Sequence, residues 1–177
     1  MTLYEFEGRK PKIDESSYVA ESADIIGDVS IGKRCFIAPG AKIKGDYGEI
    51  KIGDETSVQE NCIVHARPNE SCVIGSRVTV GHGAILHNCT IGDSAVIGMG
   101  AIVSDWAELG EWSVVGEGAV VTQNQKIPAN KIAVGVPAKL IGEVNEEFKA
   151  QWNKFKDIYA GLAERRYKEG LKKITIL

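Results

Sequence analysis

Residues 91–121, IGDSAVIGMGAIVSDWAELGEWSVVGEGAVV, decide the fold of this chain. An aliphatic side chain occurs at every sixth position of this stretch, and a small side chain lies two residues before it. Residues two apart in a strand lie on the same face, so each hexapeptide directs one large and one small side chain to the same interior. Glycine follows most of the aliphatic positions, as is typical where the backbone bends or approaches another segment closely. The stretch therefore predicts stacked short strands.

The same repeat extends outward to residues 13–127 of a chain of 177 residues. Successive aliphatic positions are six residues apart, with three exceptions. The interval is longer after Ile43 and after Val64, and one other interval is shorter. We interpret the two long intervals as loops, at residues 45–49 and 66–70. Such strands cannot close a core alone, but stacked coils bury a continuous one. With three hexapeptides in each coil, the sequence predicts a mainly β protein, a triangular parallel β-helix.

A different pattern follows the repeat. Residues 132–139 are expected to leave the edge of the β-helix as an extended strap, after which apolar side chains recur three or four residues apart. This spacing predicts one amphipathic α-helix, with Asn145 as its N-cap. Its apolar stripe consists of Val144, Phe148, Trp152, Phe155, Tyr159 and Leu162. We expect a β-helix domain with its strap over residues 1–142, and a helix over residues 143–177 that packs on the β-helix or on a neighbouring subunit.

Composition excludes some functional classes. The net charge is −3 and basic residues do not cluster, so the electrostatic pattern of a nucleic-acid-binding protein is absent. The sequence has neither a signal peptide nor a long apolar run, so we expect a cytoplasmic protein without a membrane partner. All four cysteines occupy the small interior position, which favours buried, unmodified side chains. Cys72 and Cys89 fall on neighbouring coils, and the sequence leaves open whether they form a disulfide.

The only histidines of the chain are His65, His82 and His87. Three imidazoles leave the fourth position of a zinc ion free for water, which is the arrangement of a catalytic site. Counting repeats instead of residues stacks His65, His87 and Lys44 in one column on one outer face. The same count places His82 and Gln59 on the preceding face.

His82 should therefore point away from His65 and His87 of its own chain. In a threefold assembly, however, the face of His82 would meet the other two histidines of the next subunit. We infer a homotrimer with three equivalent metal sites, each with two ligands from one chain and one from its neighbour. Simpler roles remain open for individual residues: a lone histidine is often a surface residue, Lys44 could be a solvated charge, and Gln59 a polar contact.

Nearly the whole chain resembles the gamma-class carbonic anhydrases. The matching strings are IKGD at 43–46, SVQEN at 57–61, VH at 64–65, VGHGAILH at 80–87, IGMGA at 97–101 and VGVPAK at 134–139. The resemblance implies the left-handed form of the β-helix and a homotrimer with Zn²⁺, or Fe²⁺ or Co²⁺, at each interface. It also implies a lyase that hydrates CO₂ reversibly to bicarbonate, with the two-plus-one sharing of histidines that the repeat count indicates.

Further residues acquire roles from the resemblance. Gln59 is similar to a glutamine that contacts metal-bound solvent, and Tyr159 to a tyrosine that the C-terminal helix brings near the site. Asp46 matches the acidic partner of a cross-interface salt bridge, and could otherwise be a loop residue. Lys44 stands in place of the usual arginine of that bridge and lacks its bidentate fork. Tyr47 stands where the best-studied members carry a glutamate proposed as a proton shuttle, which places fast turnover in question.

Two other functions remain open from the sequence. One is a hexapeptide acyltransferase that uses acetyl-CoA, with a histidine as general base. The other is a metal-stabilised trimeric accessory protein with weak or no hydration activity.

Overall fold

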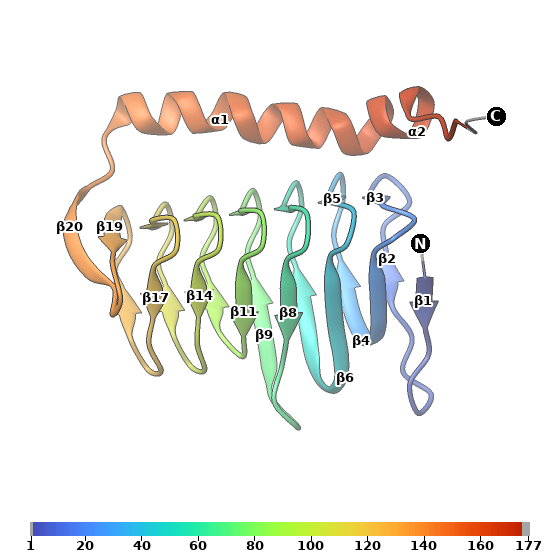
Figure 1. The fold of residues 1–177 in the computed structure, drawn as a ribbon, viewed down its shortest axis with the longest axis horizontal. Coiled ribbons are helices and arrows are strands. Elements are labelled where there is room, and N and C mark those ends of the chain that lie inside the picture. Colours follow the sequence, from blue (N-terminus) through green and yellow to red (C-terminus); the bar gives the residue numbers. More distant parts are fainter. Residues whose placement is uncertain (1, 175–177) are drawn as a thin grey trace.

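The computed structural model describes residues 2–174, which form a parallel β-helix with a long helix lying along it (Figure 1). The coils succeed one another along one axis from the N-terminal to the C-terminal end of the repeat, and the helix returns antiparallel to that direction. The predicted mainly β fold of parallel hexapeptide coils with one C-terminal helix is confirmed.

Two sheets make up the three sides of the prism. The first side, here called the histidine face, consists of β1 (Thr2–Tyr4), the first part of β4 (Asp24–Ile31) and of β6 (Lys42–Ile52), β8 (Ile63–His65), β11 (Ile85–His87), β14 (Ile102–Val103) and β17 (Val120–Val121). The second side continues the same sheet through the rest of β4 and β6, and adds β2 (Lys12–Ile13), β9 (Ser71–Ile74), β12 (Thr90–Ile91), β15 (Glu108–Leu109) and β18 (Lys126–Ile127).

The third side, here called the helix face, is a separate sheet. It consists of β3 (Tyr18–Val19), β5 (Phe36–Ile37), β7 (Ser57–Val58), β10 (Thr79–Val80), β13 (Val96–Ile97), β16 (Val114–Val115), β19 (Lys131–Val134) and β20 (Lys139–Glu143). Among the named strands of the described residues, every pairing is parallel except that of β19 with β20.

The register of the strands follows the predicted repeat. Ile43 pairs with Val64, Val64 with Leu86, and Leu86 with Val103, so successive aliphatic positions stack in one interior column. These four side chains are fully buried. Large and small interior side chains from all three sides form one continuous core cluster. Burial of this apolar surface is the main stabilising contribution to the fold.

The two predicted loops have different outcomes. Residues 66–70 do form a loop between β8 and β9. The loop expected at residues 45–49 is wrong, because β6 continues through it as one extended strand. Gly27 pairs with Gly45 and Val29 with Ile50, so a register shift against β4 accommodates the extra residues of β6. The long interval that follows Ile43 in the repeat therefore corresponds to an irregular strand and not to a loop.

The predicted extended strap is also different in the structure. Residues 131–134 add β19 to the helix face, the chain turns at Gly135, and β20 returns antiparallel to β19. Gly135 has a φ of 95°, a conformation that favours glycine, so this residue permits the reversal.

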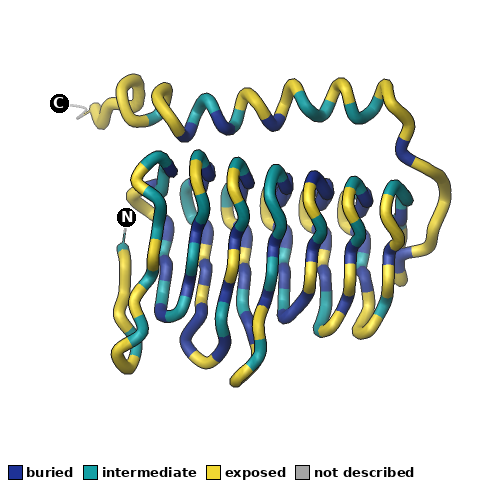
Figure 2. The backbone as a smooth tube through the Cα atoms, turned by 180° about the vertical axis from the view of Figure 1, so that it is seen from behind, coloured by how far each residue is buried: buried dark blue, intermediate teal, exposed yellow. Residues whose placement is uncertain are grey.

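The C-terminal helix comprises α1 (Glu146–Gly161), a π-helical segment η1 (Leu162–Arg166) and α2 (Tyr167–Gly170). The side chain of Asn145 caps α1 by accepting a hydrogen bond of 2.8 Å from the Phe148 N–H, as predicted. The helix packs along the helix face with its buried positions toward the coils (Figure 2). No helix among the described residues is long and apolar enough to span a membrane.

Most of the predicted stripe packs on the β-helix, and the buried face of the helix extends beyond it. The packed residues of the stripe are Val144, Phe148, Trp152, Tyr159 and Leu162. Lys156, Ala160 and Ala163 are the most buried residues of the helix, whereas Phe155 is 44% exposed. Small alanines allow α1 and η1 to approach the sheet closely, and the aliphatic stem of Lys156 covers apolar surface as a leucine would. Part of the aromatic stripe therefore faces the side of the helix instead of the coils.

All four cysteines are buried and free. The Sγ atoms of Cys72 and Cys89 lie 3.9 Å apart on neighbouring coils, so these residues are thiols in contact.

Candidate metal centre

The histidine face brings Lys44, His65 and His87 into one outer column. Lys44 pairs with His65, and His65 pairs with His87, on successive strands β6, β8 and β11. His65 Nδ1 lies 3.2 Å from His87 Nε2. Two nitrogens bound to one tetrahedral zinc ion at about 2.0–2.1 Å would lie roughly 3.3 Å apart. The spacing of these two nitrogens therefore fits two neighbouring ligands of one metal ion.

A carboxylate contacts the second nitrogen of each of these imidazoles. Asp46 Oδ1 lies 3.0 Å from His65 Nε2, and Asp105 Oδ1 contacts His87 Nδ1. Metal-binding histidines commonly donate their other ring N–H to a carboxylate, which fixes the ring and its tautomer. Each ring thus leaves one nitrogen directed at the other ring and available as a ligand.

Basic side chains neutralise both carboxylates. Lys44 Nζ lies 2.9 Å from Asp46 Oδ2 within the same chain, and Arg67 Nη1 lies 2.9 Å from Asp105 Oδ2. Burial raises the pKa of Asp46, but hydrogen bonds with Lys44 and His65 outweigh it and hold the pKa below its ordinary value. The pKa of Asp105 is lowered in the same way, because hydrogen bonds with His87 and Arg67 outweigh burial. Both carboxylates therefore remain ionised, as acceptors for the two imidazoles.

Sequence reasoning missed Asp105 and its partner Arg67. Asp105 is the first acidic residue after Val103, and Val103 stacks on Leu86, directly before His87. An acidic residue following the aliphatic position of the next coil was therefore the available signal. Arg67 gave no comparable signal, because it lies in the loop between β8 and β9.

His82 lies beyond the end of β10, at the corner of the helix face. Its Nδ1 atom is 2.5 Å from Glu60 Oε2, and its side chain is about half exposed (47%). Within the described part of one chain, no group of three or more His, Cys, Asp and Glu side chains is placed to hold a metal ion. One chain therefore does not bring its three histidines together.

His82, Gln59 and Tyr159 line one groove of about 670 Å³ between α1 and the helix face. Gln59 is buried, and Tyr159 reaches the groove from α1 with its ring 5.5 Å from that of Phe36. Burial raises the pKa of the Tyr159 hydroxyl, so this group remains a neutral hydrogen-bonding partner at neutral pH. Gln59 and His82 thus lie at the helix face with Tyr159 opposite them on α1, and the four other residues expected near a metal lie on the histidine face.

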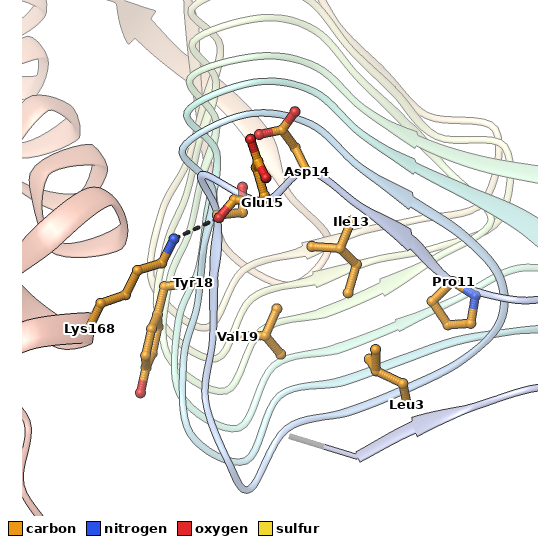
Figure 3. A pocket seen from close by; sticks show the side chains of 9 residues that line it. Leu3, Pro11, Ile13, Asp14, Glu15, Tyr18, Val19 and Lys168 are labelled. Carbon is orange, nitrogen blue, oxygen red and sulfur yellow. Dashed lines mark hydrogen bonds between the residues drawn. The ribbon is translucent and has the colours of Figure 1, made fainter.

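A second hollow lies at the N-terminal end of the β-helix (Figure 3). Leu3, Ile13 and Val19 line it beside Asp14, and Lys168 reaches its edge to donate a 2.7 Å hydrogen bond to the Glu15 carbonyl. None of the residues expected near a metal lines this hollow.

The coils and the histidine column define a hexapeptide-repeat protein, and comparison with known proteins agrees. Residues 88–123 match the family described as bacterial transferase hexapeptide (six repeats). The chain is 35% identical to gamma carbonic anhydrase 1, mitochondrial, of Arabidopsis thaliana, over 99% of this chain and 66% of that protein. It is 33% identical to the carnitine operon protein CaiE of Escherichia coli K12, over 83% of this chain and 75% of that protein.

A crystal structure of a hexapeptide transferase family protein from Anaplasma phagocytophilum is also similar. Its TM-score is 0.87 at 37% identity, with 91% of this chain and 95% of that chain covered. The chain therefore belongs to the hexapeptide-repeat family that includes the gamma carbonic anhydrases and CaiE. It spans 66% and 55% of the lengths of gamma carbonic anhydrases 1 and 2 of Arabidopsis thaliana.

Proposed function

We propose that this protein is a metal-dependent carbonic anhydrase whose sites lie between the subunits of a homotrimer. The observation that carries the proposal is the pair of ring nitrogens of His65 and His87, which lie 3.2 Å apart while each ring is held by a carboxylate. The third ligand would be His82 of the next subunit, held in turn by Glu60. Zn²⁺ suits three imidazoles, and Fe²⁺ or Co²⁺ would accept the same ligands.

A divalent ion bound there would supply Lewis acidity, which for zinc lowers the pKa of bound water to about 7. The side chains around it have separate tasks. Asp46 and Asp105 fix the rings of His65 and His87, and Lys44 and Arg67 keep those carboxylates in place. Since Gln59 is buried at the end of the groove, its amide can orient CO₂ and bicarbonate by hydrogen bonds, beside the Tyr159 hydroxyl.

Hydration of CO₂ to bicarbonate also releases a proton. Glu60 is the candidate acceptor for that proton, because its carboxylate lies beside His82 and its side chain is 37% exposed to solvent. No such candidate followed from the resemblance, since Tyr47 replaces the acidic residue of the best-studied relatives. Tyr47 is 53% exposed, and its ring packs on Phe6.

An uncovered apolar column on the histidine face supports a trimer. The outward-facing side chains of Ile63, Ile85, Ile102 and Val120 stack on successive strands, one residue before each interior position. Ile63 is 43% exposed and Ile102 is 36% exposed. An apolar ladder of this kind beside two histidines is suited to pack against another copy of the chain, which would deliver His82 to the same place.

Metal analysis combined with a hydration assay tests the proposal. We expect one metal ion per chain in the purified trimer, and CO₂ hydration in a stopped-flow assay with zinc, iron or cobalt. His82→Ala should lose the metal, whereas His82 is not needed for the fold of a single chain. A loaded trimer that hydrates no CO₂ with any of these metals would contradict the reaction, and an unloaded trimer would contradict the site.

The match to the bacterial transferase hexapeptide family keeps an acyltransferase that uses acetyl-CoA as a second candidate. Calorimetric binding of acetyl-CoA to a metal-free trimer would favour it. A trimer that His87→Ala dissociates, without hydration activity in the parent protein, would indicate the accessory role. The cytoplasmic location stays a prediction, which microscopy of the fluorescently tagged protein would test.

A further inference from the structure

The groove beside His82 is larger than hydration of CO₂ requires. Its volume of about 670 Å³ falls within the range of pockets that bind small organic molecules, roughly 300–1,000 Å³. A triatomic substrate would occupy only its polar end, at Gln59, His82 and Tyr159. The remaining length of the groove is therefore available to a larger ligand.

Glycines keep the floor of the groove open. Gly81, Gly98 and Gly116 line it on successive coils, where a Cβ atom would approach an atom of the next coil within 2.8 Å or less. At Gly81 and Gly98 the approached atoms belong to the backbone, so the coil spacing itself excludes side chains there, whereas at Gly116 the approached atom is the Val134 Cγ1 methyl. The floor is consequently a backbone surface along which an extended arm could lie.

The walls of the groove are mostly apolar. Phe148, Trp152 and Phe155 of α1 form one side, because these residues of the helix stripe turn toward the groove. Met99 lines it as well and is 53% exposed. Large aromatic surfaces of this kind bind apolar or aromatic groups.

Charge in the groove is arranged unevenly. Among the described residues that line it, no lysine or arginine is present and Glu117 is the single carboxylate, while the Glu60 carboxylate contacts His82 from outside the lining. Hydrogen bonds from Gly100 N to His82 O and from Gly118 N to Met99 O place His82, Met99 and Glu117 on three successive coils. The proposed cation would thus lie at one end and the carboxylate of Glu117 two coils away, beside the apolar part.

We propose that the groove binds organic monocarboxylates, with the carboxylate at the Gln59 and His82 end and an apolar arm along the glycine floor. The inference rests on the proposed function, because bicarbonate has the same O–C–O head group and the metal would attract it. Such acids would compete with bicarbonate for its site. Glu117 would repel a second carboxylate at the far end of the arm, so the groove should prefer monocarboxylates to dicarboxylates of the same length.

A chain-length series tests this inference without reference to catalysis. Dissociation constants of acetate, butyrate, hexanoate and adipate are measured by titration calorimetry on the intact trimer, with its metal content recorded. Each buried methylene should tighten binding roughly fourfold. Adipate should bind at least tenfold more weakly than hexanoate, and Glu117→Gln should reduce that difference, whereas Glu111→Gln, at another exposed acidic position, should not.

Phe155→Ala should reduce the gain per methylene, and Ile158→Ala is its control, since Ile158 is similarly exposed on α1 but does not line the groove. Equal affinity for acetate and hexanoate would overturn the inference whether or not metal is bound, and would mean that the neighbouring subunit fills the groove. A chain-length dependence in a trimer that hydrates no CO₂ would retain the groove and reject only the reaction.

Discussion

The helix face and the histidine face follow the same hexapeptide rules but differ in what covers them. On the helix face, the outward column that includes Val96 and Val114 lies under α1, and these residues are 3% and 9% exposed. The equivalent column on the histidine face leaves Ile63 and Ile102 43% and 36% exposed. Both columns stack apolar side chains on successive strands, and only one of them is covered by the described part of the chain.

The difference indicates how the chain divides its structural and functional roles. The helix face is completed within one chain and positions Gln59, His82 and Tyr159. The histidine face positions His65 and His87 beside an apolar ladder that lacks a cover. We therefore interpret the part of the helix face under α1 as completed within the monomer fold, and the histidine face as the surface that packs against the His82 edge of the next subunit.

The largest effect is expected on the covered face. Phe36 is 1% exposed and its ring lies 5.0 Å from that of Tyr167 and 5.5 Å from that of Tyr159. Phe36→Ala should lower the free energy of unfolding by about 3–5 kcal/mol, since it leaves a cavity beneath the helix. Chemical denaturation at fixed protein concentration measures this loss, with Phe155→Ala as the exposed aromatic control. A loss below about 1 kcal/mol would mean that the helix is not a structural cover.

The second effect should appear in association instead of folding. Ile102→Asp places a charge within the uncovered ladder, and we expect it to weaken trimer formation by about 2 kcal/mol or more per interface. Analytical ultracentrifugation should then detect monomers that retain the circular dichroism of the parent protein. Ile141→Asp is the control, because Ile141 is 64% exposed on β20 of the other face. If Ile102→Asp and Ile141→Asp both remain trimeric, this apolar ladder is not the interface between subunits.

A smaller effect is expected on metal affinity, without loss of the trimer. Asp105→Asn removes the carboxylate that holds the His87 ring, and we expect metal affinity to fall about 10- to 100-fold while the trimer persists. Competition with a chromophoric chelator measures the affinity. Asp24→Asn, which removes a carboxylate paired with Lys42 on the same face, should leave it unchanged. If the parent protein, Asp105→Asn and Asp24→Asn bind the metal with equal affinity, Asp105 does not position the His87 ring.

The smallest effect concerns the attachment of α1 and depends on pH. Lys156 is buried beneath Trp112 and Trp152, and its Nζ atom lies 3.3 Å from Thr79 Oγ1 and 3.4 Å from the Ala95 carbonyl oxygen. Burial lowers its pKa from 10.5 to about 7, and the nearby charge of Arg77 adds to this shift. Between these two values the unfolded chain binds more protons, so stability should increase with pH.

We expect the parent protein to gain about 1 kcal/mol between pH 7.5 and pH 8.5, relative to Lys156→Met. Denaturation of both proteins across this range measures the difference. Parallel pH profiles would indicate that Lys156 reaches solvent.

The sequence predicted the features that depend on repeat geometry. Interior stacking of Ile43, Val64 and Leu86, and the outer column of Lys44, His65 and His87, follow from counting hexapeptides, because a parallel coil carries each position onto the next. The count failed where the backbone departs from the repeat. At residues 45–49 a register shift within β6 replaced the expected loop, and spacing alone cannot distinguish these outcomes.

Side-chain partners beyond the repeat were harder to predict. Asp105 reaches His87 from the next coil through its side-chain conformation, which no periodicity specifies. The apolar stripe did not predict that Ala160 and Ala163 are among the most buried residues of the helix, or that a lysine, Lys156, is buried beside them. The roles of Gln59, Asp46 and Tyr159 stay predictions.

The central claim is that each metal site is shared between neighbouring chains, and mixing two inactive variants tests it most directly. His82→Ala chains retain His65 and His87, while His87→Ala chains retain His82, so neither homotrimer should hold zinc at its sites. After the two variants are refolded together and mixed trimers are isolated by dual affinity tags, elemental analysis should find one zinc ion per trimer, since one interface then combines all three histidines. Mixed trimers without zinc would contradict a shared site.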